Sequence, residues 1–359
     1  MKRILLITES LSSGGAERQL CGLASMLVKA GYQCKLITYI YNQFYEAFLK
    51  SNSVDYEYVP QLQNKYLRIF RAAKYVRSYH PDVVISYLPS VNKMMCLAKF
   101  FYRSKLIISE RNNNISISTS DIILFNIYRK ADYIVPNSHS QADFINTNFS
   151  FLSSKIHPII NFVDVNRFFP VENNTNNADL KIITVARYTE QKNVLTYLQV
   201  IRKVKDSGLR VHFDWYGDKK LYPAYYSQVE HLYNQLQIAD YLTLHDSDKE
   251  IENRYHEADI FCLPSLYEGY PNVVVEAMSS GLPILCSNCY ENPYIVSEGV
   301  NGFLFNPNSV DDIFCAIKKM LNLSFSKRKE MGRINRQLCL VRNTRETFLK
   351  AYEELIFKL

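Results

Sequence analysis

The sequence predicts an α/β protein made of two doubly wound domains, each with a parallel sheet that helices cover on both faces. The chain has 359 residues, of which 47% are hydrophobic, enough for two cores at roughly 100–200 residues per domain. Short β-branched runs alternate with amphipathic segments, which is typical of βα units and parallel strands. One Asn-rich stretch, 171–179, divides this alternation into two series. In such domains, ligands bind at the carboxyl ends of the strands.

The first series begins with a strand at 4–8, which serines and the pair Gly14-Gly15 separate from the next element. Residues 16–30 place Leu20, Leu23 and Leu27 on one helical face, and Gly31 ends that helix. Further strands are expected at 35–39, 56–59, 83–87, 106–109, 133–136 and 155–160, and further helices at 45–51, 66–79, 91–102, 120–130 and 140–148.

The second series repeats the same alternation after residue 179. Strands are expected at 181–186, 211–217, 242–244, 260–264 and 284–287, followed by a hairpin-like segment at 299–305. Helices are expected at 193–207, 224–236, 250–257, 310–321, 326–341 and 344–357.

Composition excludes several classes of protein. No stretch reaches the roughly 18 uncharged apolar residues of a membrane-spanning helix. The apolar run in MKRILLITES is too short for a secretion signal, so we expect a buried first strand and a cytoplasmic protein. The eight cysteines are scattered, and Cys286 and Cys289 form one C-x-x-C without a second pair, which argues against a zinc site.

The net charge of +7 is concentrated in the first half of the chain. Residues 1–165 hold 19 Lys and Arg against 11 Asp and Glu, a balance of +8, whereas residues 166–359 hold 23 against 24, a balance of −1. A basic half indicates an acidic partner or an anionic membrane surface, and no nucleic-acid recognition motif accompanies it. The helix at 65–79 interleaves cations with aromatic and aliphatic residues. It is either a solvated face of its domain or a surface for anionic lipid headgroups.

Two glutamates flank a turn in the segment 267–283, which reads YEGYPNVVVEAMSSGLP. Glu268 precedes the Gly-Tyr-Pro-Asn turn, and Glu276 lies in the apolar, small-residue run that follows it. The start of a helix after a turn presents unpaired backbone N–H groups, which attract phosphates. Carboxylates beside such a place can accept hydrogen bonds from sugar hydroxyls.

Other residues extend or limit this chemistry. Arg187 ends a strand and Lys192 follows five residues later, an arrangement that suits a diphosphate leaving group. Gly14-Gly15 lets a backbone approach a ligand closely, but the G-x-G-x-x-G pattern of a nicotinamide enzyme is absent. Asp246-Ser247-Asp248 could hold a metal, although its place before a helix favours an N-cap.

With these residues in this order, the chain resembles a glycosyltransferase of family 4 with the two-domain GT-B fold. The signature is two glutamates separated by seven residues, Glu268 and Glu276, in EGYPNVVVEAM followed by SSGLP. Supporting matches over nearly the whole chain are Gly14-Gly15-Ala16-Glu17-Arg18, Asn137-Ser138, NFVDVNRF from Asn161, and Arg187 with Lys192. Ser109-Glu110-Arg111-Asn112 resembles a bacterial subset that builds surface polysaccharides such as capsule and lipopolysaccharide O-antigen, and lipid-linked oligosaccharides, often from UDP-sugars.

The resemblance implies two Rossmann-like domains that face a cleft. An acceptor-binding domain would span 1–165, a nucleotide-sugar-binding domain 166–342, and a helix at 343–359 would return to the first domain. The implied enzyme is a retaining, metal-independent hexosyltransferase without a cofactor, which moves a hexose or N-acetylhexosamine from a UDP-sugar to a polyprenyl-diphosphate-linked glycan. Its partners would be the nucleotide sugar, the lipid-linked acceptor and the anionic inner face of the cytoplasmic membrane, with no nucleic acid.

The resemblance also implies roles for individual residues. Arg187 and Lys192 would neutralise the diphosphate as the glycosidic bond breaks, Glu276 would hold the ribose hydroxyls, and Glu268 would contact the donor sugar. Further donor contacts would come from Gly217, Gly269, Tyr270, Pro271, Asn272 and Val273. The loop with Gly14, Gly15 and Glu17 would approach the phosphates or the acceptor, and candidate acceptor or sugar contacts are Glu110, Arg111, Asn112, Asn137 and Ser138.

The sequence departs from the family pattern at two places, and at one of them the glycine-rich turn after the strand at 211–216 is reduced to Gly217-Asp218. Many relatives place a histidine at the end of a strand in the middle of the first domain, where this chain has Ser109-Glu110-Arg111-Asn112. The role of that histidine is therefore unassigned, with Glu110 and Arg111 as candidates.

Two alternatives to a glycosyltransferase remain. One is a sugar-nucleotide epimerase on the same fold, which would turn over donor without acceptor, and the other is a non-catalytic nucleotide-sugar-binding partner.

Overall fold

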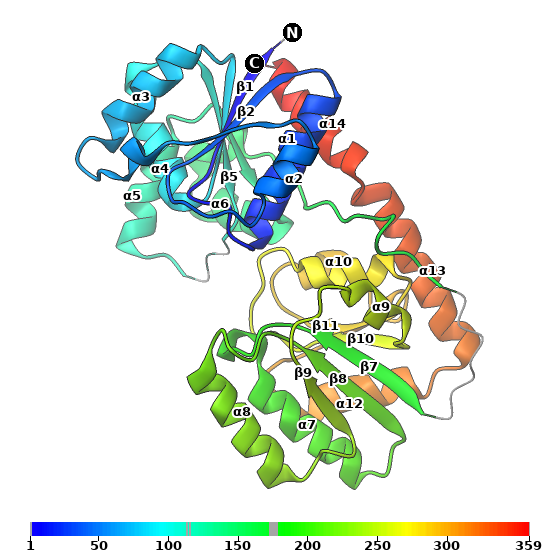
Figure 1. Ribbon diagram of the computed structural model, residues 1–359. Coiled ribbons are helices and arrows are strands. Elements are labelled where there is room, and N and C mark those ends of the chain that lie inside the picture. The colour runs from blue at the N-terminus through cyan, green and yellow to red at the C-terminus, as the bar shows by residue number, and fades with distance from the viewer. Residues whose placement is uncertain (1, 113, 115, 172–178, 359) are drawn as a thin grey trace. The chain divides into compact units, whose positions relative to one another are not determined.

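The computed structural model describes residues 2–112, 114, 116–171 and 179–358, and the chain forms two compact units. Unit 1 comprises Met1–Phe162 and Arg345–Leu359, and unit 2 comprises Val163–Thr344. Each unit holds one six-stranded sheet of parallel strands (Figure 1). The predicted class of two doubly wound α/β domains is confirmed. The expected linker at 171–179 falls on residues 172–178, which lie outside the described part of the chain.

The sheet of unit 1 has the strand order β3-β2-β1-β4-β5-β6. Leu5 in the central strand lies opposite Lys35 on one side and Val84 on the other. Because the order reverses beside β1, the carboxyl ends of β1 and β4 form the switch point where ligands bind in such sheets. The strands are β1 Arg3–Ile7, β2 Gln33–Thr38, β3 Asp55–Tyr58, β4 Val83–Tyr87, β5 Lys105–Glu110 and β6 Tyr133–Pro136.

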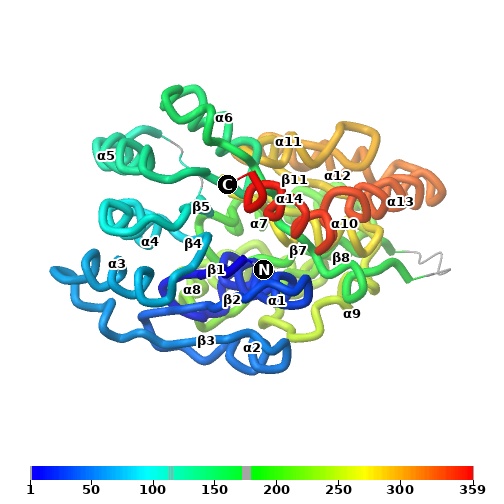
Figure 2. The backbone as a smooth tube through the Cα atoms, turned by 90° about the horizontal axis from the view of Figure 1, so that it is seen from above, coloured from blue at the N-terminus to red at the C-terminus, as the bar shows by residue number. Residues whose placement is uncertain are grey.

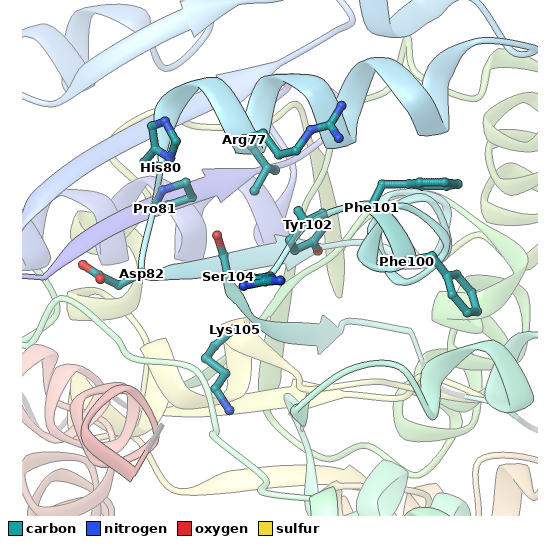
Figure 3. A pocket seen from close by; sticks show the side chains of 11 residues that line it. Arg77, His80, Pro81, Asp82, Phe100, Phe101, Tyr102, Ser104 and Lys105 are labelled. Atoms are coloured by element: carbon teal, nitrogen blue, oxygen red, sulfur yellow. The ribbon is translucent and has the colours of Figure 1, made fainter.

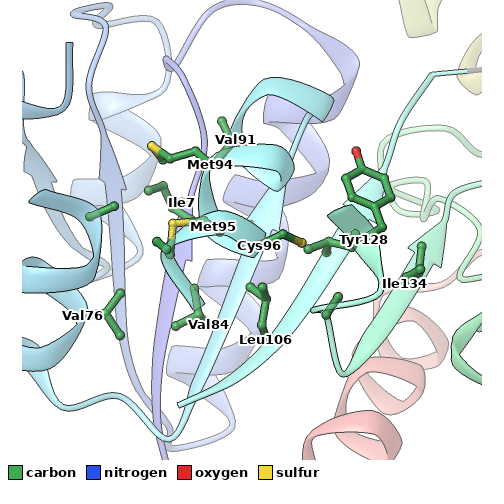
Figure 4. Packing of buried hydrophobic residues seen from close by; sticks show 14 of the residues in the cluster. Ile7, Val76, Val84, Val91, Met94, Met95, Cys96, Leu106, Tyr128 and Ile134 are labelled. Carbon is green, nitrogen blue, oxygen red and sulfur yellow. The ribbon is translucent and has the colours of Figure 1, made fainter. Parts of the chain in front are cut away.

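The helices of unit 1 cover both faces of its sheet (Figure 2). They are α1 Gly15–Lys29, α2 Glu46–Ser51, α3 Arg68–Tyr79, α4 Pro89–Ala98, α5 Thr119–Tyr128, α6 His139–Asn148 and α14 Arg345–Lys358, with 3-10 turns η1 Pro60–Gln63, η2 Lys99–Phe101 and η3 Ser150–Lys155. On one face, α1 and α14 lie side by side and bury Leu23, Phe348 and Tyr352 with inward residues of the sheet. On the other face, α3 to α6 bury Met95, Leu106 and their neighbours (Figure 4).

Unit 2 repeats this architecture with the strand order β12-β11-β10-β7-β8-β9. Its strands are β7 Leu180–Val185, β8 Val211–Tyr216, β9 Leu242–His245, β10 Ile260–Leu263, β11 Ile284–Ser287 and β12 Gly302–Phe305. Its helices are α7 Val194–Asp206, α8 Pro223–Leu236, α9 Ile251–His256, α10 Asn272–Ser279, α11 Asn292–Ile295, α12 Val310–Leu321 and α13 Phe325–Arg342, with the 3-10 turn η4 Glu190–Lys192. Trp215 and Tyr197 are buried against each other in its core.

Two predicted elements are wrong. The expected strand at 155–160 is the end of η3 followed by an extended edge segment, in which Ile156 forms only an isolated bridge with Ile134. Pro158, which has no N–H to donate, limits that segment to an edge position. The expected hairpin at 299–305 is a turn followed by β12, which pairs in parallel with β11, so that Gly302 lies opposite Ile284.

The longest described helix, α13, has 18 residues and carries charged side chains along its length. Within the described ranges, no helix combines the length and the apolar composition that crossing a bilayer requires.

Candidate functional site

The carboxyl ends of the parallel strands in unit 2 bring together loops that are far apart in the sequence. The loop after β7 carries Arg187 and Lys192, and the loop after β10 carries Glu268. Hydrogen bonds fasten the two loops, because the N–H of Leu266 donates to the carbonyl of Gln191 at 2.9 Å and Nε2 of Gln191 donates to the carbonyl of Tyr267 at 2.9 Å. The edge of the sheet thus holds these polar residues on a fixed backbone.

Lys192 and Glu268 form an ion pair at this edge. Nζ of Lys192 lies 2.5 Å from Oε1 of Glu268, and the two side chains are 11% and 8% exposed. The next residue, Asn193, has the left-handed φ of 59° that ends η4, and its Nδ2 donates to the carbonyls of Pro264 at 3.1 Å and Pro307 at 2.7 Å. These bonds position Lys192, because they hold the backbone directly after it. Sequence reasoning missed Asn193, although an Asn before a helix is a known signal for such a conformation.

The turn after Glu268 leads directly into α10. The helix begins after Pro271, which provides no side-chain cap, so its first turn presents the positive end of the helix dipole. Glu276 lies one turn further along and is 5% exposed, and the hydroxyl of Tyr255 donates to its Oε2 at 3.4 Å. Tyr270 is buried in the turn, and its hydroxyl accepts from Nδ2 of Asn343 at 2.6 Å. The hydrogen bond to Asn343 therefore anchors Tyr270 and with it the turn before α10.

Arg187 and Gly217 follow the neighbouring strands β7 and β8 at the same edge of the sheet. Arg187 is exposed, and its Nη1 is 3.5 Å from the hydroxyl of Tyr222. It forms no ion pair with any described residue, so its guanidinium is available to an anion. Gly217 follows β8 at a point where a Cβ atom would lie 2.2 Å from the carbonyl oxygen of Ala186. Only glycine allows the ends of β7 and β8 to approach so closely.

In the Asp246-Ser247-Asp248 sequence, both carboxylates accept hydrogen bonds from nearby groups. Oδ1 of Asp246 accepts from the N–H of Ser247 at 2.8 Å, and Asp248 accepts from Nε of Arg254 at 2.9 Å. Asp248 also accepts from the N–H of Glu250, the residue that stands at the N-cap of α9, so the expected N-cap lies two residues too early. The described residues contain no group of three or more His, Cys, Asp or Glu side chains that could hold a metal ion.

In unit 1, Glu17 folds back over the start of α1. Gly14 is the N-cap residue, and a Cβ atom there would lie 2.1 Å from Oε2 of Glu17. Ser12 donates to the other carboxylate oxygen of Glu17 at 2.8 Å. Gly15 begins the helix. The carboxylate of Glu17 therefore lies against Gly14, in the space that a side chain at that position would need.

Glu110 points into the core of unit 1. It is 1% exposed and accepts hydrogen bonds from the hydroxyl of Tyr128 and from Nδ2 of Asn92, the latter at 2.9 Å. Burial raises the pKa of its carboxyl above the ordinary value.

Arg111 connects β5 with α14. Its guanidinium lies 4.1 Å from the ring centre of Tyr87, and it donates to Asn161 at 2.6 Å and to the hydroxyl of Tyr352 at 3.2 Å. In this structure both Glu110 and Arg111 therefore make contacts that hold unit 1 together.

The remaining candidates of unit 1 differ in exposure. Asn112 is exposed, whereas Ser138 is buried and caps α6 by accepting from the N–H of Gln141. Asn137 is 5% exposed, and its Oδ1 has no partner among the described residues. Sequence reasoning also missed Glu9, which follows β1 and accepts from the hydroxyls of Ser90 and Tyr39. An acidic residue directly after the central strand was the available signal.

Two family models match consecutive parts of the chain. The model "Glycosyltransferase Family 4" matches residues 13–167, and the model "Glycosyl transferases group 1" matches residues 165–338.

Some curated relatives match nearly the whole chain. The amylovoran biosynthesis glycosyltransferase AmsD of Erwinia amylovora is 24% identical over 92% of this chain and 93% of its own length. The GalNAc-alpha-(1->4)-GalNAc-alpha-(1->3)-diNAcBac-PP-undecaprenol alpha-1,4-N-acetyl-D-galactosaminyltransferase of Campylobacter jejuni is 24% identical over 99% of both chains.

Among solved structures, a glycosyltransferase from Rickettsia africae superposes with a TM-score of 0.88 at 17% identity, over 99% of this chain and 98% of that chain. Anabaena Alr3699/HepE in complex with UDP-glucose superposes with a TM-score of 0.85 at 17% identity, over 100% of both chains. These likenesses establish the GT-B fold. The two family models together span residues 13–338, and the chain belongs to the glycosyltransferases, as an enzyme that joins a family 4 domain to a group 1 domain.

Proposed function

We propose that this glycosyltransferase is retaining and metal-independent, and that it moves a hexose or N-acetylhexosamine from a UDP-sugar to a glycan on a polyprenyl diphosphate. The glycan would be a bacterial surface polysaccharide such as O-antigen or capsule. The observation that carries the proposal is the buried ion pair of Lys192 and Glu268 beside the uncapped start of α10. A cation, a carboxylate and the positive end of a helix suit a sugar bound through a diphosphate.

The donor would bind at the carboxyl edge of unit 2. Lys192 and Arg187 would contact the diphosphate, which gains negative charge as the glycosidic bond breaks, so cations fixed there stabilise the transition state. Glu268 holds the ammonium of Lys192 in place before the donor arrives, and its second oxygen would accept from a sugar hydroxyl. Glu276 would accept from the ribose hydroxyls, oriented by the hydroxyl of Tyr255.

The donor and acceptor classes have support from the similar proteins. Alr3699/HepE has been solved with UDP and with UDP-glucose. The names of three relatives specify acceptors on undecaprenyl diphosphate, among them the UDP-Gal:alpha-D-GlcNAc-diphosphoundecaprenol alpha-1,3-galactosyltransferase of Escherichia coli, which is 29% identical over 46% of this chain. A polyprenyl carrier lies in a membrane, so the proposal includes peripheral contact with an anionic bilayer.

The basic helix α3 supports that membrane contact. Tyr66, just before it, is 92% exposed, and Phe70 within it is 58% exposed. Exposed aromatic side chains among cations are typical of surfaces that lie on anionic headgroups.

The test is a panel of UDP- and GDP-sugars, measured first for thermal stabilisation and then for release of the nucleotide with and without a polyprenyl-diphosphate glycan acceptor. We expect one UDP-sugar to stabilise the protein and to release UDP only when acceptor is present. The product, examined by proton NMR, should keep the anomeric configuration of the donor, and EDTA should leave the rate unchanged. An inverted product or a rate lost in EDTA would refute the mechanism, and exclusive use of a GDP-sugar would refute the donor class.

A matched pair of variants assigns the site. Glu276→Ala should abolish most transfer, because it removes the proposed ribose contact, whereas Glu230→Ala, at an exposed position of α8 in the same unit, should transfer normally. Full activity in Glu276→Ala would refute the assignment.

A further inference from the structure

A cavity of about 860 Å³ opens in unit 1 at the amino ends of β4 and β5. Its walls are the C-terminal end of α3, the turn η2 and the segments that lead into the two strands (Figure 3). The volume lies within the roughly 300–1,000 Å³ that small-molecule sites occupy. Glu9 and Asn137 follow β1 and β6 at the opposite, carboxyl edge of the sheet, and Glu110 is the last residue of β5 at the same edge. The cavity is therefore separate from the ligand-binding edge of the sheet.

The cavity carries an excess of positive charge. Arg77, Arg103 and Lys105 line it together with one carboxylate, Asp82, which leaves a balance of 3 − 1 = +2. Asp82 already accepts the N–H of Arg3 at 2.6 Å, and Lys105 is 3.6 Å from a carboxylate oxygen of Asp132. Arg77 and Arg103 have no ion-pair partner among the described residues. Two guanidinium groups are thus available to an anion.

Phenylalanines stand exposed beside these cations. Phe100 and Phe101 line the cavity and are 64% and 43% exposed. The ring of Phe101 packs against Phe70 of α3, with ring centres 5.1 Å apart, and Phe70 is itself 58% exposed. Nζ of Lys130 lies 4.4 Å from the ring centre of Phe100, which adds a further cation to this border. Exposed aromatic rings contribute nothing to the binding of a soluble anion, whereas a bilayer buries such rings at its headgroup boundary.

We propose that this cavity binds the phosphate of an anionic phospholipid, with Arg77 and Arg103 on the phosphate oxygens and with Phe100, Phe101 and Phe70 at the headgroup boundary. The inference rests on the membrane contact in the proposed function and gives that contact a defined site. The bilayer would thereby lie against α3 and η2. Neither arginine takes part in glycosyl transfer.

The first test is flotation of the full chain with phosphatidylcholine vesicles, with or without phosphatidylglycerol. The wild-type protein should float only with phosphatidylglycerol. Arg77→Ala/Arg103→Ala should lower the vesicle affinity by roughly thirty-fold, from about five-fold for each cation near an anionic surface. The matched control, Lys29→Ala/Lys50→Ala, removes the same charge from α1 and α2, which pack in the other core of unit 1, and should lose much less.

Each contrary result has a distinct meaning. An equal loss in both double variants would overturn the cavity as a site while leaving membrane contact intact. No flotation of the wild-type protein would overturn both. Retention of vesicle binding in the arginine variant, with loss of inorganic phosphate binding measured by calorimetry, would assign the cavity to a soluble phosphate instead.

A second measurement, tryptophan fluorescence, reports directly on the exposed phenylalanines beside the cavity. The chain has one tryptophan, Trp215, which is 1% exposed in unit 2, so Phe100→Trp introduces a reporter with little background change. Its emission should shift to the blue with phosphatidylglycerol vesicles and not with inorganic phosphate. If the emission stayed unchanged although the protein bound the vesicles, the residue at position 100 would remain in water. That result would overturn the proposal.

Discussion

Lys192 and Glu268 meet with their charged atoms 2.5 Å apart, and little of either side chain reaches solvent. They lie 76 residues apart in sequence, so their contact depends on two loops that the parallel sheet brings to one edge. A buried pair of this kind contributes little net stability, but loss of one partner leaves an uncompensated charge.

The first prediction separates the chemistry of this pair from its structural role. Lys192→Met should lower the free energy of unfolding by about 3–5 kcal/mol, because the buried carboxylate of Glu268 loses its cation, and should lower transfer by about 10²-fold or more. Lys192→Met/Glu268→Gln should recover most of the stability and none of the transfer. Urea unfolding and UDP release measure the two effects. A double variant that regained transfer would show that the pair is only structural.

The second prediction concerns Gly217. Gly217→Ala should destabilise unit 2 by about 1–3 kcal/mol, because the added Cβ overlaps the backbone carbonyl of Ala186 and the strands must shift. The control is Gly208→Asn, at a glycine with φ of 70° and open space around it, a conformation that Asn tolerates. Thermal unfolding should distinguish the two variants, and equal melting temperatures would contradict the close approach.

The third prediction is a pH dependence from Glu110. Burial raises the pKa of Glu110 in the folded state, so the folded chain binds more protons than the unfolded chain above the ordinary carboxyl pKa of about 4.3. The free energy of unfolding should therefore fall as pH rises through the window between these two pKa values. Glu110→Gln should remove that decline, as measured by urea unfolding across the window.

Glu57 provides a control, because its contribution to the free energy of unfolding should change with pH in the opposite direction. Burial acts to raise its pKa, but hydrogen bonds from Tyr75 at 2.6 Å and Lys35 at 3.1 Å lower the pKa overall. Its contribution to stability is present above the ordinary carboxyl pKa and is lost as pH falls through the lowered one. Glu57→Gln should therefore destabilise the protein at neutral pH and not in strong acid. The same sign for both variants would contradict the assignment of Glu110.

The fourth prediction tests how Arg111 holds α14. Arg111→Lys loses the stacking on Tyr87 and the paired hydrogen bonds to Asn161 and Tyr352, which an ammonium cannot reproduce. We expect a loss of about 2 kcal/mol and faster amide exchange in α14. Arg129→Lys, over the exposed ring of Phe151, should cost less than about 1 kcal/mol. Unchanged exchange in α14 would contradict the role.

The sequence by itself determined the fold class and the family. The alternation of β-branched runs and amphipathic segments favours parallel strands covered by helices, and the linker between its two series favours two doubly wound domains. The two glutamates of 267–283, together with Arg187 and Lys192, identified the family because their order and spacing are specific. The local sequence pattern predicted the wrong element at 155–160 and at 299–305. In both segments, the strand that is available for pairing decides what forms, and the run of residues alone does not.

The tertiary structure alone decided which polar residues meet and which are buried. Glu110 and Lys192 look equally available in the sequence, yet one points into the core of its sheet and the other lies at a strand edge beside Glu268. The cavity between α3 and η2 likewise joins cations that belong to separate segments. Side-chain direction and long-range contact depend on packing, which sequence spacing does not specify, because residues far apart in the chain become neighbours only when the sheet forms.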